Sequence, residues 1–232
     1  MALVRSRVPE LMDNPALDPR AHHDALRGLA RLNRVAGVDR LIWNIVAPKL
    51  RRCAAPIRFL DVATGSGDLP VELARRAKDE GLSIALHGCD ISPVALGCAR
   101  TAAISAGFTL HTHTLNVLTD HLPGAFDIAH CGLFLHHLDP PQVQHVLRQM
   151  SVAAKCVIVQ DLCRSWVGLS LACVVPRLLT RSRIVHTDAV RSVRGAYTIE
   201  EMRQLAQGAG LDGVTIRGVR PERLLLVWER TQ

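Results

Sequence analysis

The sequence predicts an α/β fold in which helices cover both faces of a mostly parallel sheet. From residue 57 onward, short apolar runs alternate with segments of helical period, and the runs are nearly continuous, as in strands buried on both faces. The last two runs are only a few residues apart, so they predict an antiparallel hairpin at the sheet edge. The chain has 232 residues, 48% hydrophobic and 21% charged, so it can bury a large core and is not disordered.

The helices are predicted from apolar residues that recur every three or four positions and from the residues at their ends. The first helical stretch follows Asp18-Pro19, and the last one begins at a capping box formed by Thr198 and Glu201. Gly107 ends another helix, because glycine readily adopts the left-handed conformation after a C-terminus. Helices are expected over residues 21–46, 69–78, 93–106, 141–153 and 199–208.

The strands are predicted from the apolar runs between these helices. They are expected over residues 57–62, 83–90, 109–117, 126–132, 156–162, 213–219 and 223–229. After Asp161 come an apolar segment at 166–179 and a polar stretch that ends at Ala196. The apolar segment is shorter than the roughly 20 residues that cross a bilayer, so no membrane span is expected.

The strongest local signal is a glycine-rich turn between a strand and a helix. Residues 59–69 read Phe-Leu-Asp-Val-Ala-Thr-Gly-Ser-Gly-Asp-Leu, so a ligand can approach bare backbone amides beside a helix N-terminus. Asp90 ends the next strand, where a carboxylate can accept hydrogen bonds from two ribose hydroxyls. Together the turn and Asp90 predict a cofactor that contains adenosine.

Two other classes of nucleotide site are disfavoured by the same segment. A dinucleotide fingerprint requires a third glycine where this chain has Pro70. The phosphate-binding pattern G-x-x-x-x-G-K-[ST] does not occur in the sequence. NAD, FAD and nucleoside triphosphates are therefore not the expected ligands.

The glycine-rich segment resembles the first motif of class I S-adenosylmethionine (SAM)-dependent methyltransferases. The likeness continues at residues 90–92, 126–138 and 209–211. The sequence of residues 61–69 is also similar to that of quinone-biosynthesis methyltransferases. The resemblance implies a doubly wound, seven-stranded sheet with an antiparallel last strand. We expect a SAM-binding domain at residues 51–232. Helical period and position further predict an N-terminal helical cap or lid at residues 1–50 and an inserted lid segment at about 164–196.

By this resemblance, SAM is the cofactor and binds at the carboxyl edge of the sheet. Ala63 stands where the family usually has its first glycine, and Asn116 replaces the acid often found after the third strand. An amide can still accept from the adenine amino group and donate to a ring nitrogen. The predicted cofactor residues are Asp61, Ala63, Gly65, Gly67, Asp90, Ile91, Asn116, Val117 and His130.

Catalytic candidates follow the fourth and fifth strands, where open α/β sheets bind ligands. His136, His137 and Asp161 are predicted to handle the acceptor's proton, since histidine titrates near neutrality. The two histidines are adjacent and point about 100° apart on a helical turn, so at most one faces the acceptor, and His136 is slightly preferred. The alternative is that both are buried histidines that hold the loop, in which case proximity alone drives methyl transfer.

The expected acceptor is a small lipophilic molecule, methylated on a phenolic or polyketide-type oxygen or on an activated ring carbon. The apolar segment and the N-terminal helices would cover it, with Trp166 and Tyr197 as candidate contacts, although an ordinary core helix explains that segment equally well. No His-x-x-x-His pair or His/Cys cluster with ligand spacing occurs, so no metal site is expected.

Charge and composition leave two competing functions open. Residues 1–60 and 161–232 are basic, which suits an RNA methyltransferase, but aromatic residues make up only 3% and no added RNA-binding module is evident. The second competitor, a catalytically silent partner subunit with a SAM fold, is disfavoured by the intact glycine turn and Asp90. DNA is not an expected partner, since no Asn-Pro-Pro-Tyr motif follows the fourth strand.

The expected location is the cytoplasm. No continuous apolar stretch occurs in the first fifteen residues, and the seven cysteines form no Cys-x-x-Cys pair, as expected of free thiols. Contact of the arginine-bordered segment 166–179 with a membrane surface is an open alternative.

Overall fold

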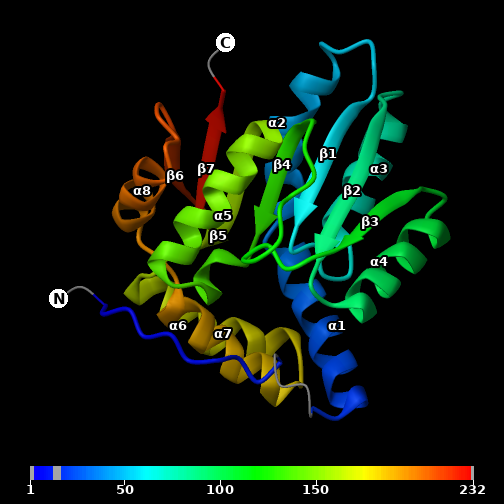
Figure 1. The fold of residues 1–232 in the computed structure, drawn as a ribbon. Coiled ribbons are helices and arrows are strands. Elements are labelled where there is room, and N and C mark those ends of the chain that lie inside the picture. Colours follow the sequence, from blue (N-terminus) through cyan, green and yellow to red (C-terminus); the bar gives the residue numbers. More distant parts are fainter. Residues whose placement is uncertain (1–2, 13–16, 231–232) are drawn as a thin grey trace.

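The computed structural model describes residues 3–12 and 17–230, and its centre is a seven-stranded sheet of order β3-β2-β1-β4-β5-β7-β6 (Figure 1). The pairs among β1 to β5 are parallel, and β7 runs antiparallel to both of its neighbours, β5 and β6. The predicted fold class, a mostly parallel seven-stranded sheet with an antiparallel last strand, is confirmed. The strands are β1 (Ile57–Val62), β2 (Ile84–Asp90), β3 (Leu110–Thr114), β4 (Phe126–Gly132), β5 (Ala154–Leu162), β6 (Thr215–Val219) and β7 (Arg223–Glu229).

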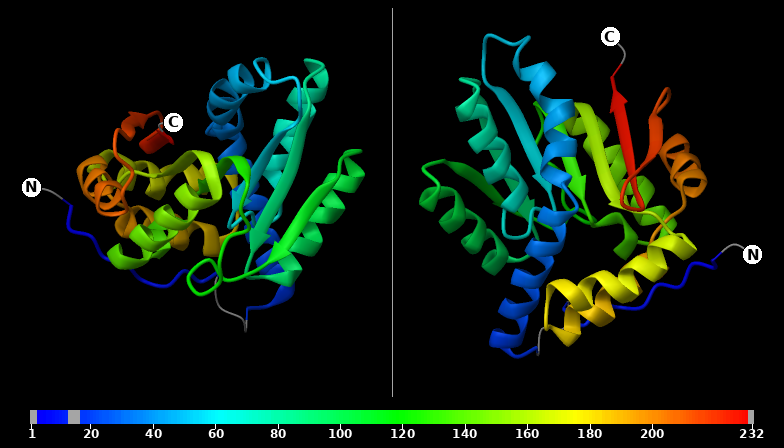
Figure 2. Two further views of the ribbon diagram at one scale, coloured as in Figure 1. Left: turned by 45° about the horizontal axis from the view of Figure 1, so that its top comes forward. Right: turned by 180° about the vertical axis from the view of Figure 1, so that it is seen from behind.

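Helices cover both faces of the sheet (Figure 2). On one face, α2 (Val38–Leu50), α3 (Asp68–Asp79) and α4 (Pro93–Ser105) bury their apolar residues against Phe59 and Ile158. The other face packs against α5 (Pro140–Ala153) and α8 (Ile199–Gly208). Because successive side chains of a strand point to opposite faces, each strand contributes to both of these apolar clusters.

The parallel strands end together at one edge, and the chain reverses its strand order between β1 and β4. In open α/β sheets this switch point is where ligands bind. The arrowheads of β1, β2 and β4 point toward the elements below them in Figure 1. These elements are α1 (Pro19–Val35), η1 (Leu135–His137), α6 (Trp166–Leu179) and α7 (Arg183–Gly195).

The structure differs from the predicted elements at the N-terminus and before residue 196. The single helix expected over 21–46 is two helices, because the chain turns at Gly37, whose φ of 63° is left-handed. Residues 3–12 of the predicted helical cap are extended. The polar stretch that ends at Ala196 forms α7, an amphipathic helix whose buried face includes Val185 and Val193.

The apolar segment predicted at 166–179 is helix α6. No helix in the described part of the chain has the length and apolar character that a bilayer span requires. Four of its apolar side chains recur at three- and four-residue steps and are exposed, so they form a stripe on the surface. They are Val167, Leu171, Val174 and Leu178.

Gly67 is the position of the glycine-rich turn where a side chain is least tolerable. Its φ is +74°, and a Cβ would lie 2.9 Å from the Cβ of Ala99. We expect Gly67→Ala to lower the free energy of unfolding by about 2–4 kcal/mol, through left-handed strain and overpacking.

Gly97, within α4, provides the matched control because a Cβ there meets open space. Gly97→Ala should raise the free energy of unfolding by about 0.5–1 kcal/mol. Urea denaturation of both variants checks the pair, and a Gly67→Ala protein as stable as the wild type would contradict it.

Candidate functional site

The glycine-rich turn at the end of β1 is tied to the end of β2. Ala63, Gly65 and Gly67 all have left-handed φ values, of 55°, 55° and 74°. The Asp90 carboxylate accepts hydrogen bonds from the backbone N–H of Gly65 and of Ser92, both at 2.9 Å. A Cβ at Gly65 would meet open space, so the backbone of the turn stays open to a ligand beside this carboxylate.

The residues around this turn fit an adenosine group. Each oxygen of Asp90 keeps a second lone pair after its backbone hydrogen bond, so the carboxylate can still accept from ribose hydroxyls. The side chain of Ile91 is 65% exposed and offers an apolar surface to a flat ring. After β3, the Oδ1 of Asn116 accepts from the backbone N–H of Leu118 at 3.0 Å, and Val117 between them is buried.

A buried acid–histidine pair joins the ends of β1 and β4. The Nδ1 of His130 lies 2.6 Å from the Oδ1 of Asp61, and the Thr64 hydroxyl donates to the other carboxylate oxygen at 2.8 Å. Within the described residues, neither the Nε2 of His130 nor the side-chain amide of Gln160 has a hydrogen-bond partner. A Cβ at Gly132 would lie only 2.8 Å from the His130 ring. A buried polar atom without a partner costs about 1–3 kcal/mol, so these groups suit the polar part of a ligand.

A second acid–histidine pair lies at the end of β5. The Nδ1 of His136, in η1, is 2.6 Å from the Oδ1 of Asp161. The other oxygen of Asp161 accepts from the His136 backbone N–H at 3.1 Å, and both side chains are at least 95% buried. This pair belongs to the opposite face of the sheet from Asp61 and His130, because Asp161 alternates with Gln160 along β5.

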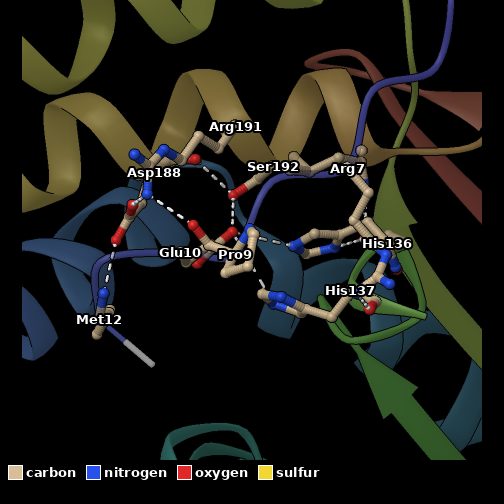
Figure 3. Close-up of polar contacts among 12 residues, drawn as sticks. Arg7, Pro9, Glu10, Met12, His136, His137, Asp188, Arg191 and Ser192 are labelled. Atoms are coloured by element: carbon tan, nitrogen blue, oxygen red, sulfur yellow. Dashed lines mark hydrogen bonds and ion pairs between the residues drawn. The ribbon is translucent and has the colours of Figure 1, made fainter. Parts of the chain in front are cut away.

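Glu10 faces the outer nitrogens of both neighbouring histidines (Figure 3). Its Oε1 lies 3.6 Å from the Nε2 of His136 and 3.9 Å from the Nε2 of His137. The hydroxyl of Ser192 donates to the same carboxylate oxygen. The two imidazole centroids are 4.1 Å apart, so one acidic group meets two imidazole rings.

The two carboxylates hold a proton on His136. Burial alone would lower the pKa of His136, but Asp161 and Glu10 outweigh it and raise that pKa to about 10. Burial raises and His136 lowers the pKa of Asp161, and the result lies below its ordinary value of 3.8. At neutral pH His136 is therefore an imidazolium between two carboxylates, and it can accept a proton only after this arrangement changes.

Glu10 is presented by an extended segment, here called the strap (residues 3–12), that lies along α7. The Asp188 carboxylate accepts from the backbone N–H of Leu11 at 2.8 Å, and Arg191 donates to the carbonyl of Pro9 at 2.6 Å (Figure 3). These bonds on either side of Glu10 fix the path of the backbone, so the carboxylate is held in place.

Arg164 fastens the start of the strap to two helices. Its buried guanidinium donates to the carbonyl of Leu3 at 2.7 Å and to the carbonyl of Ala196 at 2.6 Å. It also lies 2.5 Å from Glu201, in the first turn of α8. One side chain thus joins the strap, the end of α7 and the start of α8.

Tyr197 and Trp166, the predicted acceptor contacts, lie in different surroundings. Tyr197 is buried, its hydroxyl donates to the carbonyl of Leu138 at 2.6 Å, and Arg5 lies 4.0 Å from its ring centroid. Trp166 begins α6 and is 58% exposed. Contact of either residue with an acceptor stays a prediction.

A cavity of about 100 Å³ lies between the strap and η1. A larger hollow, of about 500 Å³, lies between α1 and the end of α6, but none of the predicted site residues lines it. The smaller cavity is therefore the one that borders the predicted catalytic histidines. Its lining residues are Arg7, Val8, Pro9, Glu10, His136, His137, Arg191, Ser192 and Gly195.

Four residues of these two sites had no signal in the sequence. Glu10 lies in a short segment without periodicity, and Asp188 and Ser192 lie in the polar stretch before residue 196. Gln160 lies within an apolar run, where a single amide is inconspicuous. Only a fold that brings the N-terminus to η1 and α7 reveals the first three as neighbours of the histidines.

Comparison with known proteins agrees with this description. Residues 59–155 match the family described as "Methyltransferase domain". A demethylmenaquinone methyltransferase from Deinococcus radiodurans is 36% identical over 104 residues, which are 44% of this chain and 41% of the relative. The matched part thus spans about two fifths of that curated relative. The resemblance to SAM-dependent methyltransferases, and to those of quinone biosynthesis, is confirmed.

Solved structures share the fold at low sequence identity. The methyltransferase SibL has a TM-score of 0.70 and 19% identity, with 98% of this chain and 64% of that chain covered. Magnesium protoporphyrin IX methyltransferase from Synechocystis, solved with bound S-adenosylhomocysteine (SAH), has a TM-score of 0.57 and 17% identity. In that comparison 95% of this chain and 91% of that chain are covered. These likenesses show the fold.

The ion pair between Glu201 and Arg164 makes stability depend on pH. Burial would raise the pKa of Glu201, but hydrogen bonds from Arg164 and Thr198 hold it below its ordinary value of 4.5. A depressed folded-state pKa stabilises the protein above the unfolded pKa, and the stabilisation is lost as pH falls through the folded pKa. Glu201→Gln should therefore lower the free energy of unfolding by about 1 kcal/mol at neutral pH, the value being modest because Glu201 is partly exposed.

Urea unfolding at neutral pH and at about pH 3 measures this difference between the wild type and Glu201→Gln. The difference should shrink toward zero in acid. A difference that is the same at both pH values would show that the ion pair is not its source.

Proposed function

We propose that this protein is a SAM-dependent methyltransferase that acts on a hydroxyl or an activated ring carbon of a small lipophilic acceptor. The observation that carries the proposal is the open glycine turn fastened to Asp90 at the switch point of the sheet. The cluster of Glu10, His136 and Asp161 lies at the same carboxyl edge. Residues that can bind the cofactor and residues that can handle a proton are thus found at the same edge of the sheet.

The cofactor would be held by the residues at the ends of β1 to β4. The open backbone at Gly65 lies beside it, Asp90 accepts from its ribose, and Ile91 and Asn116 flank its adenine. The unpaired nitrogen of His130 faces its polar end. SAM supplies a methyl group on a sulfonium, and the protein's task is to align the acceptor and exclude water.

The acceptor's reacting group would lie in the cavity beside η1. Asp161 fixes the ring of His136, so that its Nε2 points toward Glu10 and the cavity. A hydroxyl placed there meets the Glu10 carboxylate and the His136 imidazolium, so His136 can take the proton it must lose only after the charge between these two groups is rearranged. His137 borders the same cavity and is the second candidate for this role.

The helices that cover the carboxyl edge of the sheet support a lipophilic acceptor. Helices α1, α6 and α7 lie at the carboxyl edge, and α6 carries an exposed apolar stripe. The Deinococcus radiodurans relative is named for demethylmenaquinone, a small molecule, which also favours this class of acceptor.

Replacement of Asp90 tests cofactor binding. Asp90→Asn should weaken SAM and SAH binding by about 2–3 kcal/mol, because it removes the charge from the hydrogen bonds to the ribose. Calorimetry measures the affinity, with Asp212→Asn, at an exposed aspartate, as the matched control. Unchanged affinity in Asp90→Asn would remove the assignment.

Replacement of His136 and Asp161 tests acceptor activation. In assays with labelled SAM against phenols, quinones, polyketides and bulk RNA, His136→Ala and Asp161→Asn should each reduce turnover about 10²–10⁴-fold. SAM affinity should stay near the wild-type value, as should both properties in the control His121→Ala. Near wild-type turnover in both variants would exclude the cluster from catalysis, and preferred methylation of RNA would overturn the small-molecule acceptor.

A further inference from the structure

Three potential metal ligands meet at the cavity between the strap and η1. The Oε1 of Glu10, the Nε2 of His136 and the Nε2 of His137 all lie within 4.8 Å of one another (Figure 3). Glu10 and the histidines come from segments far apart in the sequence, so no ligand spacing announces the group. It is the one such group of three found within the described residues.

The geometry points to a binding site for one divalent transition-metal ion, of which Zn²⁺ is the representative. Two imidazole nitrogens and one carboxylate oxygen are the protein ligands of many catalytic zinc sites, which keep a fourth position open. With metal–ligand distances of about 2.0–2.2 Å, tetrahedral ligands lie roughly 3.3 Å apart. The measured 3.6 and 3.9 Å from Glu10 to the two nitrogens require only small side-chain movements.

The groups behind the ligands are arranged as metal sites require. A ligating histidine usually donates its other ring nitrogen to a carboxylate, which fixes its orientation and tautomer. Asp161 is the carboxylate that orients His136, because its Oδ1 lies 2.6 Å from the Nδ1 of His136. Ser192 and the anchored strap hold Glu10 in place from the other side, so the ligands are positioned before the ion arrives.

The donor set selects the class of ion and of ligand. Mg²⁺ and Ca²⁺ prefer oxygen ligands, whereas imidazole suits Zn²⁺ and its first-row neighbours. The side chain of His137 is 28% exposed and lines the cavity, which gives the ion a route of entry. If the proposed methyl transfer holds, an oxygen of the acceptor is the group that would complete the open position.

Zn²⁺ titration of chelator-treated full-length protein tests the site by calorimetry. The parent for this test carries His113→Ala, because His87 and His113 have ring nitrogens 3.3 Å apart that would also attract Zn²⁺. The parent should bind one Zn²⁺ and should not bind Mg²⁺ at the same concentration. Co²⁺ in place of Zn²⁺ should give the visible absorption of a tetrahedral site.

Substitutions in this parent separate the ligands from the group behind them. Asp161→Asn should weaken Zn²⁺ binding roughly 10–100-fold, and Glu10→Gln and His137→Gln by more than that, since they remove ligands. His121→Ala, at an exposed histidine, should bind as the parent does. Thermal unfolding confirms that each variant is folded.

Zn²⁺ binding to folded Glu10→Gln as tight as to the parent would overturn the site, and so would a parent that binds no Zn²⁺. Because the readout is metal binding, either result leaves the test of methyl transfer unaffected. Conversely, a protein that binds one Zn²⁺ through these ligands but transfers no methyl group would uphold this inference and refute the proposed function.

Discussion

The buried carboxylate of Asp161 is the constraint on which the acceptor side of the molecule depends. A carboxylate this deeply buried is costly unless it is paired and hydrogen-bonded. The ring and backbone N–H of His136 satisfy both of its oxygens. The loop after β4 must therefore bend into η1 directly above the end of β5.

The position of η1 in turn fixes the place of the N-terminus. Once His136 is held as an imidazolium by Asp161, its outer nitrogen needs a second acceptor, and Glu10 supplies it. The strap follows this path because Arg191 on α7 donates to the carbonyl of Pro9, and because Arg164 donates to the carbonyl of Leu3 at the start of the strap. The strap is therefore held by hydrogen bonds and ion pairs to η1, α7 and Arg164. These contacts explain why a mainly extended segment can keep one path without pairing to a strand.

Much of the cofactor half could be predicted from the sequence, because its chemistry is local. The turn at Gly65 and the carboxylate at Asp90 are separated by one helix and one strand, so periodicity alone places them on neighbouring strand ends. The seven-stranded, mostly parallel sheet and the terminal hairpin followed from the same alternation together with the family resemblance. The break at Gly37 was missed because a glycine in a helical pattern is ambiguous, and helix α7 was missed because its apolar face is narrow. The prediction of a helical cap was also wrong for residues 3–12, which are not helical.

The acceptor half could be predicted only in part, because it is non-local. His136, His137 and Asp161 could be selected as residues after strands, but nothing in the sequence shows that Glu10 lies opposite the two rings. The expectation of no metal site rested on the spacing of ligands within single elements, and that spacing says nothing about Glu10, which is far from both histidines in the sequence. The buried amide of Gln160 escaped for a related reason, since its lack of a partner is a property of the packed sheet.

The two acid–histidine pairs, Asp61 with His130 and Asp161 with His136, differ in whether the Nε2 of the histidine has a partner. This difference separates the site into two parts. At the end of β4, the Nε2 of His130 is buried and has no hydrogen-bond partner among the described residues. That nitrogen suits a polar group of a bound molecule. At the end of β5, the Nε2 of His136 already faces Glu10, so a neutral hydroxyl gains little there unless the charge between them is rearranged. In the proposed function the open pair would belong with the cofactor and the charged pair with the acceptor, since methyl transfer needs a firmly bound cofactor and an acceptor that is activated only when it arrives.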